Sequence, residues 1–207
     1  MIQPGEHVAI FGMTGSGKST LTKKVRAMFP RVIIFDRLQE WESGPNTVSD
    51  FDSFKRVYRA AYPLDQFEII FRPRPGLSDQ ALLDVTNQIL ALTYQVEAYN
   101  KKGLGLVFEE VWLYAPLFNI PHWFQETMLT GRHQRISVIG NSQRPAHVSK
   151  TLISQARHVF VGQYYEYRDR KYFEDTFGRI PELANPPEKF HFWWFRSNEK
   201  PLLIKTM

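Results

Sequence analysis

The chain has 207 residues, of which 43% are hydrophobic and 23% charged, and this suits one well-buried α/β domain over residues 1–207 with no room for a second full domain. Its formal net charge of +5 permits nucleic acid as a partner without demonstrating it. The absence of cysteine excludes a disulfide framework and cysteine-ligated zinc. No apolar run reaches the roughly 18 to 20 residues of a membrane span, so we expect a soluble, intracellular chain with no transmembrane segment of its own.

The first predicted element is a strand at Val8–Phe11, and the next eight residues match a phosphate-binding loop in sequence and context. We expect its glycines to adopt positive φ and approach the phosphates, with Lys18 reaching the β and γ phosphates of ATP. Ser19 is the expected Mg2+ ligand, with Thr20 beside it. A glycine-rich turn with a surface lysine is the alternative. The residues predicted to bind the nucleotide are Gly12, Met13, Thr14, Gly15, Ser16, Gly17, Lys18, Ser19 and Thr20.

Alternating helices and strands follow the loop in chain order. The patterns predict a helix with Leu21, Val25 and Met28 that stops before Pro30, a strand at Val32–Phe35 with Asp36 at its tip, a loop at Gln39–Ser49, a helix at Asp50–Ala61, a strand at Phe67–Phe71, an irregular segment at Arg72–Gly76 with exposed arginines, and a helix from Asp79 to about Tyr99 capped by Ser78.

An acidic pair follows the next predicted strand, Leu106–Phe108. A carboxylate at the end of a buried strand can hold the Mg2+ that bridges the β and γ phosphates, and a second one can polarise an attacking water. We assign Glu109 to the metal and Glu110 to the water. The usual first residue is aspartate, so the opposite assignment stays open. An exposed acidic pair opening a helix is the structural alternative.

The last predicted elements are a helix from Ile120 to about His133, a strand at Ile136–Gly140, a strand at His158–Gly162 and a hairpin over residues 189–206. The strand from Ile136 delivers Asn141, Ser142 and Gln143 to its tip, beside the first strand. The amide of Gln143 can there orient the attacking water or sense the γ phosphate. Aromatic residues of the hairpin more often pack than bind bases.

Short alternating elements of this kind predict an α/β fold with a mainly parallel sheet flanked by helices and a C-terminal β-hairpin. Ligands collect at the carboxyl ends of the strands in such sheets. Every motif named so far ends a strand.

Four segments together resemble the FtsK/HerA superfamily of DNA-pumping ATPases: the phosphate-binding loop, the strand with Glu109 and Glu110 followed by Leu113–Pro116, the stretch from Thr130 to Pro145 and, weakly, residues 154–157. The chain looks most similar to the genome-packaging ATPases of tailless, membrane-containing icosahedral double-stranded DNA viruses. The resemblance implies a RecA-like (ASCE) P-loop NTPase fold and Mg2+-dependent ATP hydrolysis coupled to packaging of DNA into a preformed capsid.

The same resemblance implies a catalytic arginine acting on a neighbouring subunit, at Arg132 or, as second choice, Arg135. A ring would then be required, and the resemblance implies that it is a hexamer. The implied partners are double-stranded DNA, further copies of the chain, capsid or portal-vertex proteins and, as a further candidate, a viral membrane protein. The implied location is the host cytoplasm or the packaging vertex of the virion. The candidate residues for contacting DNA in the pore are Lys55, Arg56, Arg59, Arg72 and Arg74. For each of them, a solvent-exposed charge with no role in binding DNA is the commoner explanation.

Three other functions compete with this interpretation. A small-molecule kinase shares the lysine and serine of the loop, but no arginine-rich lid motif is evident. A GTP switch lacks its Asn-Lys-x-Asp signature. An assembly or secretion ATPase of the same superfamily, moving protein or single-stranded DNA, stays open.

Overall fold

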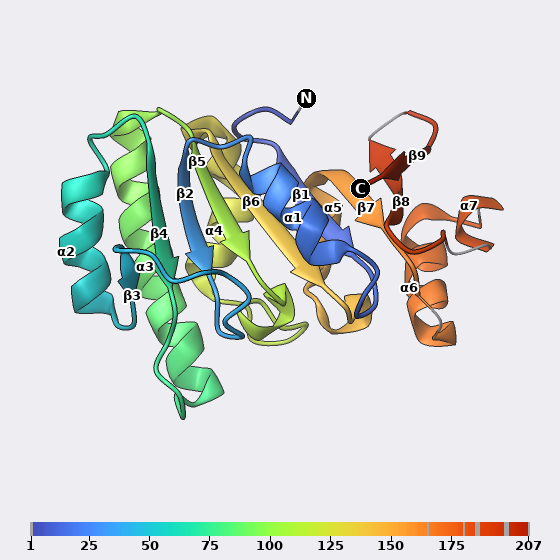
Figure 1. Ribbon diagram of the computed structural model, residues 1–207, viewed down its shortest axis with the longest axis horizontal. Coiled ribbons are helices and arrows are strands. Elements are labelled where there is room, and N and C mark those ends of the chain that lie inside the picture. The colour runs from blue at the N-terminus through green and yellow to red at the C-terminus, as the bar shows by residue number, and fades with distance from the viewer. Residues whose placement is uncertain (1, 165, 180, 185–186, 197–198, 207) are drawn as a thin grey trace.

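A computed structural model describes residues 2–164, 166–179, 181–184, 187–196 and 199–206 of the chain. The described strands form one nine-stranded sheet in the order β3-β4-β2-β5-β6-β1-β7-β8-β9 (Figure 1). The pairings from β3 to β7 are parallel, and β7-β8 and β8-β9 are antiparallel. The strands are β1 (His7–Phe11), β2 (Arg31–Phe35), β3 (Thr47–Val48), β4 (Phe67–Phe71), β5 (Leu104–Phe108), β6 (Ile136–Ser142), β7 (Ala156–Val161), β8 (His191–Arg196) and β9 (Leu202–Lys205).

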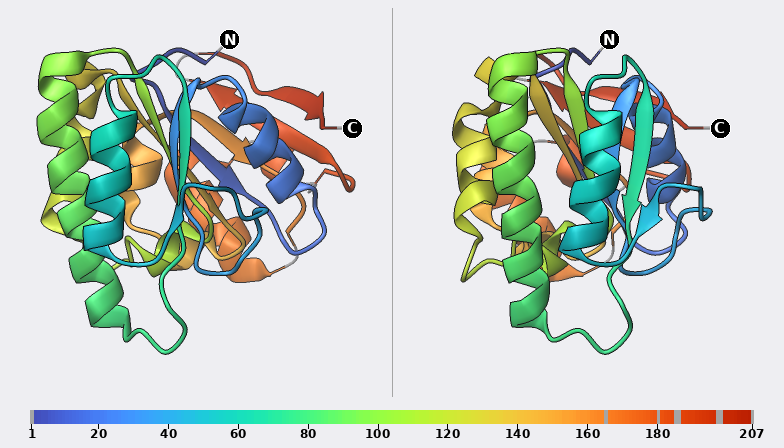
Figure 2. Two further views of the ribbon diagram at one scale, coloured as in Figure 1. Left: turned by 60° about the vertical axis from the view of Figure 1, so that its left-hand side comes forward. Right: turned by 90° about the vertical axis from the view of Figure 1, so that its left-hand side faces the viewer.

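Helices cover both faces of this sheet, as the side views show (Figure 2). One face packs against most of the helices, and the other packs against α1. The helices are α1 (Lys18–Arg26), α2 (Phe51–Ala61), α3 (Asp79–Asn100), α4 (His122–Thr130), α5 (Lys150–Gln155), α6 (Tyr167–Phe177) and α7 (Pro181–Ala184). Within the described residues, no helix is both long and apolar enough to cross a membrane.

The two layers of the core follow from the alternation of side chains along the strands. In β1, Ala9 and Phe11 belong to the layer under α3 and α4, whereas Val8 and Ile10 belong to the layer under α1. All five residues of β1 are buried, as expected for a parallel strand covered on both faces. This burial accounts for the continuous apolar run that marks the strand in the sequence.

The comparison with the predicted elements is close for the first half of the chain. The strand Phe67–Phe71 and the cap at Ser78 are confirmed, whereas Asp50, predicted to open its helix, is instead the cap that precedes Phe51. The strand predicted at 106–108 begins at Leu104, because two residues assigned to a connection pair with β6. The first helix ends at Arg26, and Met28 is 49% exposed instead of facing the core.

The C-terminal hairpin predicted over residues 189–206 is confirmed as β8 and β9, and residues 197 and 198, between these strands, lie outside the described residues. Its aromatic residues pack, as expected. Phe192 is fully buried, and Trp194 stacks on Phe160 with ring centroids 5.3 Å apart. The hairpin therefore extends the sheet beyond β7.

Candidate phosphate-binding and hydrolysis site

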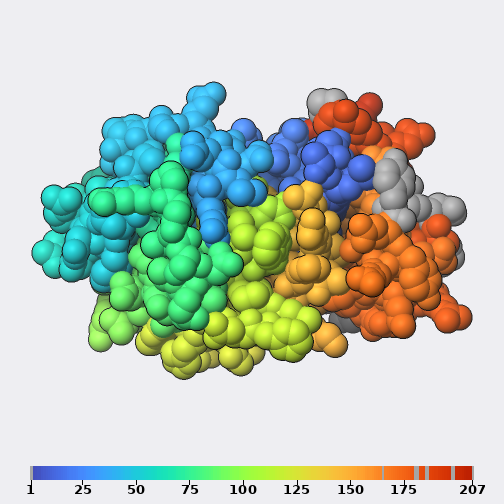
Figure 3. Space-filling model, turned by 90° about the horizontal axis from the view of Figure 1, so that it is seen from below, coloured from blue at the N-terminus to red at the C-terminus, as the bar shows by residue number. Residues whose placement is uncertain are grey.

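The phosphate-binding loop connects β1 to α1 at the carboxyl edge of the sheet, which Figure 3 views directly. Gly15 and Gly17 have φ values of 80° and 96°, the left-handed conformation that glycine tolerates. The prediction of positive φ at Gly12 is wrong. A Cβ there would instead lie 2.6 Å from the hydroxyl of Ser16, so Gly12 is required by close packing.

The space above this loop is open at Gly15 and closed by a neighbouring side chain at Gly17. A Cβ on Gly15 would meet nothing within 4 Å, whereas one on Gly17 would lie 2.5 Å from the Phe190 ring. A cavity of about 370 Å³ lies here, and Lys18, Glu110 and Gln143 line it together with Lys189 and Phe190. The last two residues were not predicted. No local signal marks them, because the hairpin that carries them reaches the loop only in the folded chain.

The second carboxylate of the acidic pair faces the loop lysine. Glu110 has a φ of 52°, and its Oε1 lies 3.2 Å from the Nζ of Lys18. Its carboxylate also accepts hydrogen bonds from the backbone N–H of Gln143 at 3.2 Å and from the indole of Trp112 at 3.0 Å. The predicted neighbours from three separate strands therefore meet at this carboxylate, and the alternative of an exposed acidic pair is wrong because the residue is 4% exposed.

The first carboxylate is held between two neutral donors. The indole Nε1 of Trp41 donates to Glu109 Oε1 at 2.9 Å, and the amide of Asn141 donates to Oε2 at 2.5 Å. Burial raises the pKa of the Glu109 carboxyl, and these two hydrogen bonds act against that rise. Glu109 is 2% exposed, so both of its oxygens are fixed in direction.

Gln143 contacts the phosphate-binding loop itself. The hydroxyl of Thr14 donates to its Oε1 at 2.6 Å, and the residue follows β6, which lies between β1 and β5. This is the predicted position beside the first strand. The amide is thereby held at the cavity that Lys18 and Glu110 line.

The residues present fit a magnesium nucleotide. Ser19 lines the cavity at the start of α1, where backbone N–H groups and the helix dipole favour an anion. The hydroxyl of Ser19 and the carboxylate of Glu109 are oxygen donors of the kind that Mg2+ uses together with phosphate oxygens. The open space above Gly15 leaves room for the phosphates.

The two arginines expected to act on a neighbour lie at the opposite edge of the sheet. Arg132 and Arg135 precede β6, whereas Gln143 follows it, and seven strand residues separate the two ends by about 20 Å. Neither guanidinium is therefore near the cavity of its own chain. Arg132 lies beside the N-terminal segment, where its carbonyl oxygen would be 3.0 Å from a Cβ on Gly5.

The prediction that Arg72, one of the candidate pore residues, is exposed is wrong. The side chain of Arg72 is 17% exposed and donates to Asp36 Oδ2 at 2.7 Å and to the carbonyl of Trp41 at 2.6 Å. It binds the tip of β2 because Asp36 is fully buried there and needs a cationic partner. Arg74 is exposed as expected, and so are Arg56 and Arg59 on α2, while Lys55 pairs with Asp52 at the surface.

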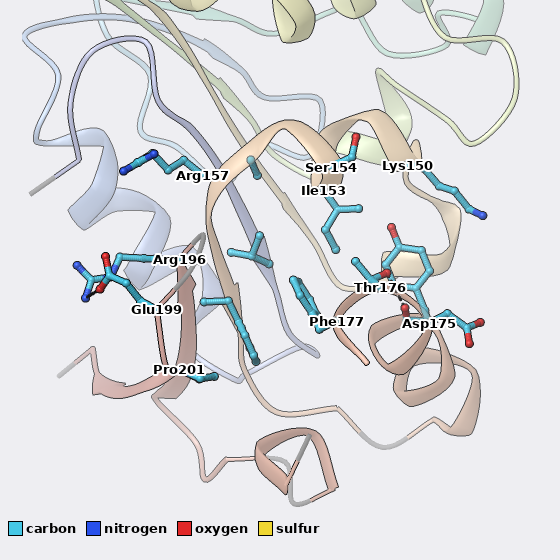
Figure 4. Close-up of a pocket in the computed structure, with 14 residues that line it drawn as sticks. Lys150, Ile153, Ser154, Arg157, Asp175, Thr176, Phe177, Arg196, Glu199 and Pro201 are labelled. Carbon is cyan, nitrogen blue, oxygen red and sulfur yellow. Dashed lines mark hydrogen bonds and ion pairs between the residues drawn. The ribbon is translucent and has the colours of Figure 1, made fainter. Parts of the chain in front are cut away.

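A larger cavity, of about 710 Å³, lies away from the loop between α5, α6, β7 and β8 (Figure 4). Ile153 and Phe177 form part of an apolar floor, and charged groups such as those of Lys150 and Asp175 lie at the rim and point outward. Its described lining includes no residue predicted to bind nucleotide or metal. The candidate site is therefore identified by its side chains and not by cavity volume.

Comparisons with known proteins found one family model and several solved structures that match this chain. Residues 5–102 match the family model described as the central domain of helicase HerA (DUF87). The match covers 98 of the 207 residues, so just under half of the chain is similar to this domain. No curated protein matches the sequence. The resemblance drawn from the motifs is confirmed by this match over residues 5–102.

Solved structures of similar fold cover nearly the whole chain. The genome packaging NTPase B204 from Sulfolobus turreted icosahedral virus 2, in complex with AMPPCP, has a TM-score of 0.74 at 15% identity and covers 99% of each chain. VirB4 of Thermoanaerobacter pseudethanolicus has a TM-score of 0.65 at 12% identity and covers 96% of this chain and 88% of that one. EccC of Thermomonospora curvata, ATPases 2 and 3 with a signal sequence peptide, has a TM-score of 0.59 at 14% identity and covers 98% and 36%. At such low identities the structural likeness shows the fold alone, which is that of a P-loop NTPase.

Proposed function

We propose that the protein is a Mg2+-dependent ATPase. The observation that carries the proposal is the convergence of Lys18, Glu110 and Gln143 on one cavity above a phosphate-binding loop. The binding of AMPPCP by a structurally similar packaging NTPase supports a nucleotide as the ligand. A kinase would need an acceptor pocket beside the same loop, and the acidic pair with Gln143 fits activation of water better.

The ion pair between Lys18 and Glu110 gives the mechanism its first step. Lys18 leaves Glu110 to neutralise the β and γ phosphates, which releases a carboxylate oxygen to accept a proton from water. The water oxygen bonds to the γ phosphorus as the bond to the β–γ bridging oxygen breaks, ADP leaves and the proton goes to Glu110. Mg2+, when bound, supplies charge neutralisation at the phosphates, and Ser19 and Glu109 would hold it.

Turnover of ATP by two variants tests this chemistry. Lys18→Ala removes the cation at the phosphates and should lower kcat about 100-fold or more. Glu110→Gln keeps the shape of the side chain but accepts no proton, and should lower kcat by about 10² to 10⁴ while ATP still binds. Undiminished turnover in both variants would refute the assignment.

We further propose that hydrolysis drives translocation of double-stranded DNA, in the manner of a genome-packaging ATPase. The net charge of +5 and the similarity to a packaging NTPase over 99% of the chain support this substrate. The similarity to VirB4 and EccC favours an assembly or secretion ATPase as the second candidate. ATPase activity measured with duplex DNA, single-stranded DNA, and metabolite acceptors separates them, because only a duplex motor is stimulated by duplex.

The position of the arginines supports a ring in which sites lie between subunits. Arg132 and Arg135 are too far from their own cavity to contact a γ phosphate there, so either would act only on a neighbour. We propose a hexamer with capsid or portal-vertex partners, a viral membrane protein as a further candidate, and a place in the host cytoplasm or at the packaging vertex.

Mixing two inactive variants tests the ring. Arg132→Ala alone should lower kcat on the order of a thousandfold. Mixed with Glu110→Gln subunits, it should regain activity at interfaces where an intact carboxylate faces an intact arginine. Arg135→Ala mixed in the same way is the matched control. Absence of rescue at every ratio for Arg132 would exclude it as the residue acting on the neighbour.

A further inference from the structure

Each carboxylate of the acidic pair receives a hydrogen bond from a different tryptophan. Trp41 donates its indole N–H to Glu109 Oε1 at 2.9 Å, and Trp112 donates its own to Glu110 Oε2 at 3.0 Å. Both indoles are half-buried, and both carboxylates are almost fully buried. Neither tryptophan is part of a motif that the sequence analysis used.

The loop after β2 is fixed so that the Trp41 indole reaches a residue 68 positions away. Asp36 at the tip of β2 accepts the backbone N–H groups of Glu40 at 2.8 Å and of Trp41 at 3.3 Å. Arg72 clamps the same turn by donating to Asp36 and to the Trp41 carbonyl at 2.6 Å. Three anchors on one short turn set the direction of the indole, because they fix the backbone on both sides of it.

Trp112 reaches its carboxylate by a different route. It lies in the 3₁₀ turn Val111–Leu113, directly after Glu110, whose φ of 52° turns the chain sharply at the end of β5. The carboxylate of Glu110 folds back over this turn and accepts the indole N–H. It also accepts the hydroxyl of Ser142 at 3.3 Å. The two tryptophans therefore contact the two acids from separate segments of the chain.

We propose that Trp41 is the positioning residue of a metal-binding carboxylate at Glu109, and that Trp112 is the positioning residue of a water-activating carboxylate at Glu110. This inference rests on the proposed ATPase function and names how its site is held. A neutral N–H fixes the direction of a carboxylate oxygen without adding a positive charge that would compete with Mg2+. Asn141 completes the arrangement by binding the other oxygen of Glu109 at 2.5 Å.

The matched variants Trp41→Phe and Trp112→Phe test this division of roles, because each removes one indole N–H and keeps an aromatic ring. We expect Trp41→Phe to raise the Mg2+ concentration at half-saturation about 10- to 100-fold, both for equilibrium binding of a fluorescent non-hydrolysable ATP analogue and for ATPase activity. Its kcat at saturating Mg2+ should return to within about threefold of wild type. Trp112→Phe should lower kcat about 10-fold or more at every Mg2+ concentration and leave the Mg2+ midpoint within about twofold.

Two controls separate positioning from loss of fold. Trp123→Phe changes a half-buried tryptophan of α4 that packs on Tyr94, away from the acids, and should leave both quantities unchanged. Binding of the analogue in EDTA should be the same in wild type, Trp41→Phe and Trp112→Phe, because it depends on Lys18 and the loop. A loss of that binding in Trp41→Phe would show that the indole only supports the fold, and would overturn the proposal.

Three further outcomes of these measurements also test the proposed roles of the tryptophans. An unchanged Mg2+ midpoint in Trp41→Phe overturns the inference while leaving the ATPase proposal intact, provided that the wild type is active. A midpoint shift in Trp112→Phe instead would reverse the roles of Glu109 and Glu110 and also overturn it. A wild type that neither binds the analogue with Mg2+ nor hydrolyses ATP refutes the proposed function, and the inference with it.

Discussion

The stability of the fold should depend on pH through His7, the first residue of β1. His7 is 4% exposed, and its Nδ1 accepts the backbone N–H of Val138 at 3.0 Å. Burial lowers the pKa of the imidazole from 6.5 to about 4; the charge of Arg132 acts in the same direction, and the carbonyl of Met128 acts against it. The neutral ring is therefore the form that the folded chain accommodates.

The sign and size of the effect follow from linkage. Because the pKa is lower in the folded chain, the unfolded chain binds the proton first, so stability is fully present above pH 6.5 and falls as the pH drops toward 4. A gap of about 2.5 pKa units, at about 1.4 kcal/mol each, limits the loss to about 3.4 kcal/mol. Between pH 7 and pH 5 the loss from this group should be about 2 kcal/mol.

Urea unfolding at both pH values, compared with His7→Asn, isolates this contribution. The variant keeps an acceptor for the Val138 N–H but does not titrate, so its free energy of unfolding should fall by about 2 kcal/mol less than that of wild type between pH 7 and pH 5. Other groups titrate equally in both chains and cancel in the difference. Equal losses in the two proteins would refute the reasoning.

Two further predictions concern buried contacts. In the intact fold the side chain of Arg31 is 1% exposed and its guanidinium lies 2.6 Å from the carboxylate of Glu97. Glu97→Ala removes this partner and should lower the free energy of unfolding by about 3 to 5 kcal/mol. A loss below about 1 kcal/mol in urea unfolding would contradict this. Gly17→Ala would combine backbone strain at positive φ with a Cβ 2.5 Å from the Phe190 ring, whereas Gly15→Ala would have the backbone strain alone. Gly17→Ala should therefore weaken binding of a fluorescent ATP analogue and lower the free energy of unfolding more than Gly15→Ala does. Equal effects on urea unfolding would show that the Phe190 ring moves away from the added Cβ at no cost.

The elements that the sequence predicted well are those with a strong local cause. The strand at Phe67–Phe71 is a short apolar run between turn signals, and the cap at Ser78 is a side chain that accepts the N–H three residues on. The phosphate-binding loop combines a motif with a strand before it and a helix after it. In each case the residues that determine the structure lie within a few positions of it.

The features that were missed depend on distant partners. Strand β3 has two residues and exists through its pairing with β4, and α5 and α6 were not predicted. The exposure of Arg72 was wrong because its partner Asp36 is 36 positions away. The indole of Trp41 at the acidic pair has no local signal either, since its loop is polar and irregular in the sequence.

The site assembles from separate segments because the ends of β1 and β6 and the acidic pair after β5 lie at the same level in the sheet. In the parallel register Phe108 pairs with Gly140, and Ser142 pairs with Phe11, so Glu110, two residues beyond Phe108, lies level with Ser142 and with the end of β1. A slip of one residue would turn every side chain of a strand to the other face and bury the wrong layer. The buried core therefore fixes the register of the strands. That register places Glu110, the end of β6 and the phosphate-binding loop at the same level along the sheet. Substitutions at the strand ends can then alter the chemistry while the buried strands keep the frame.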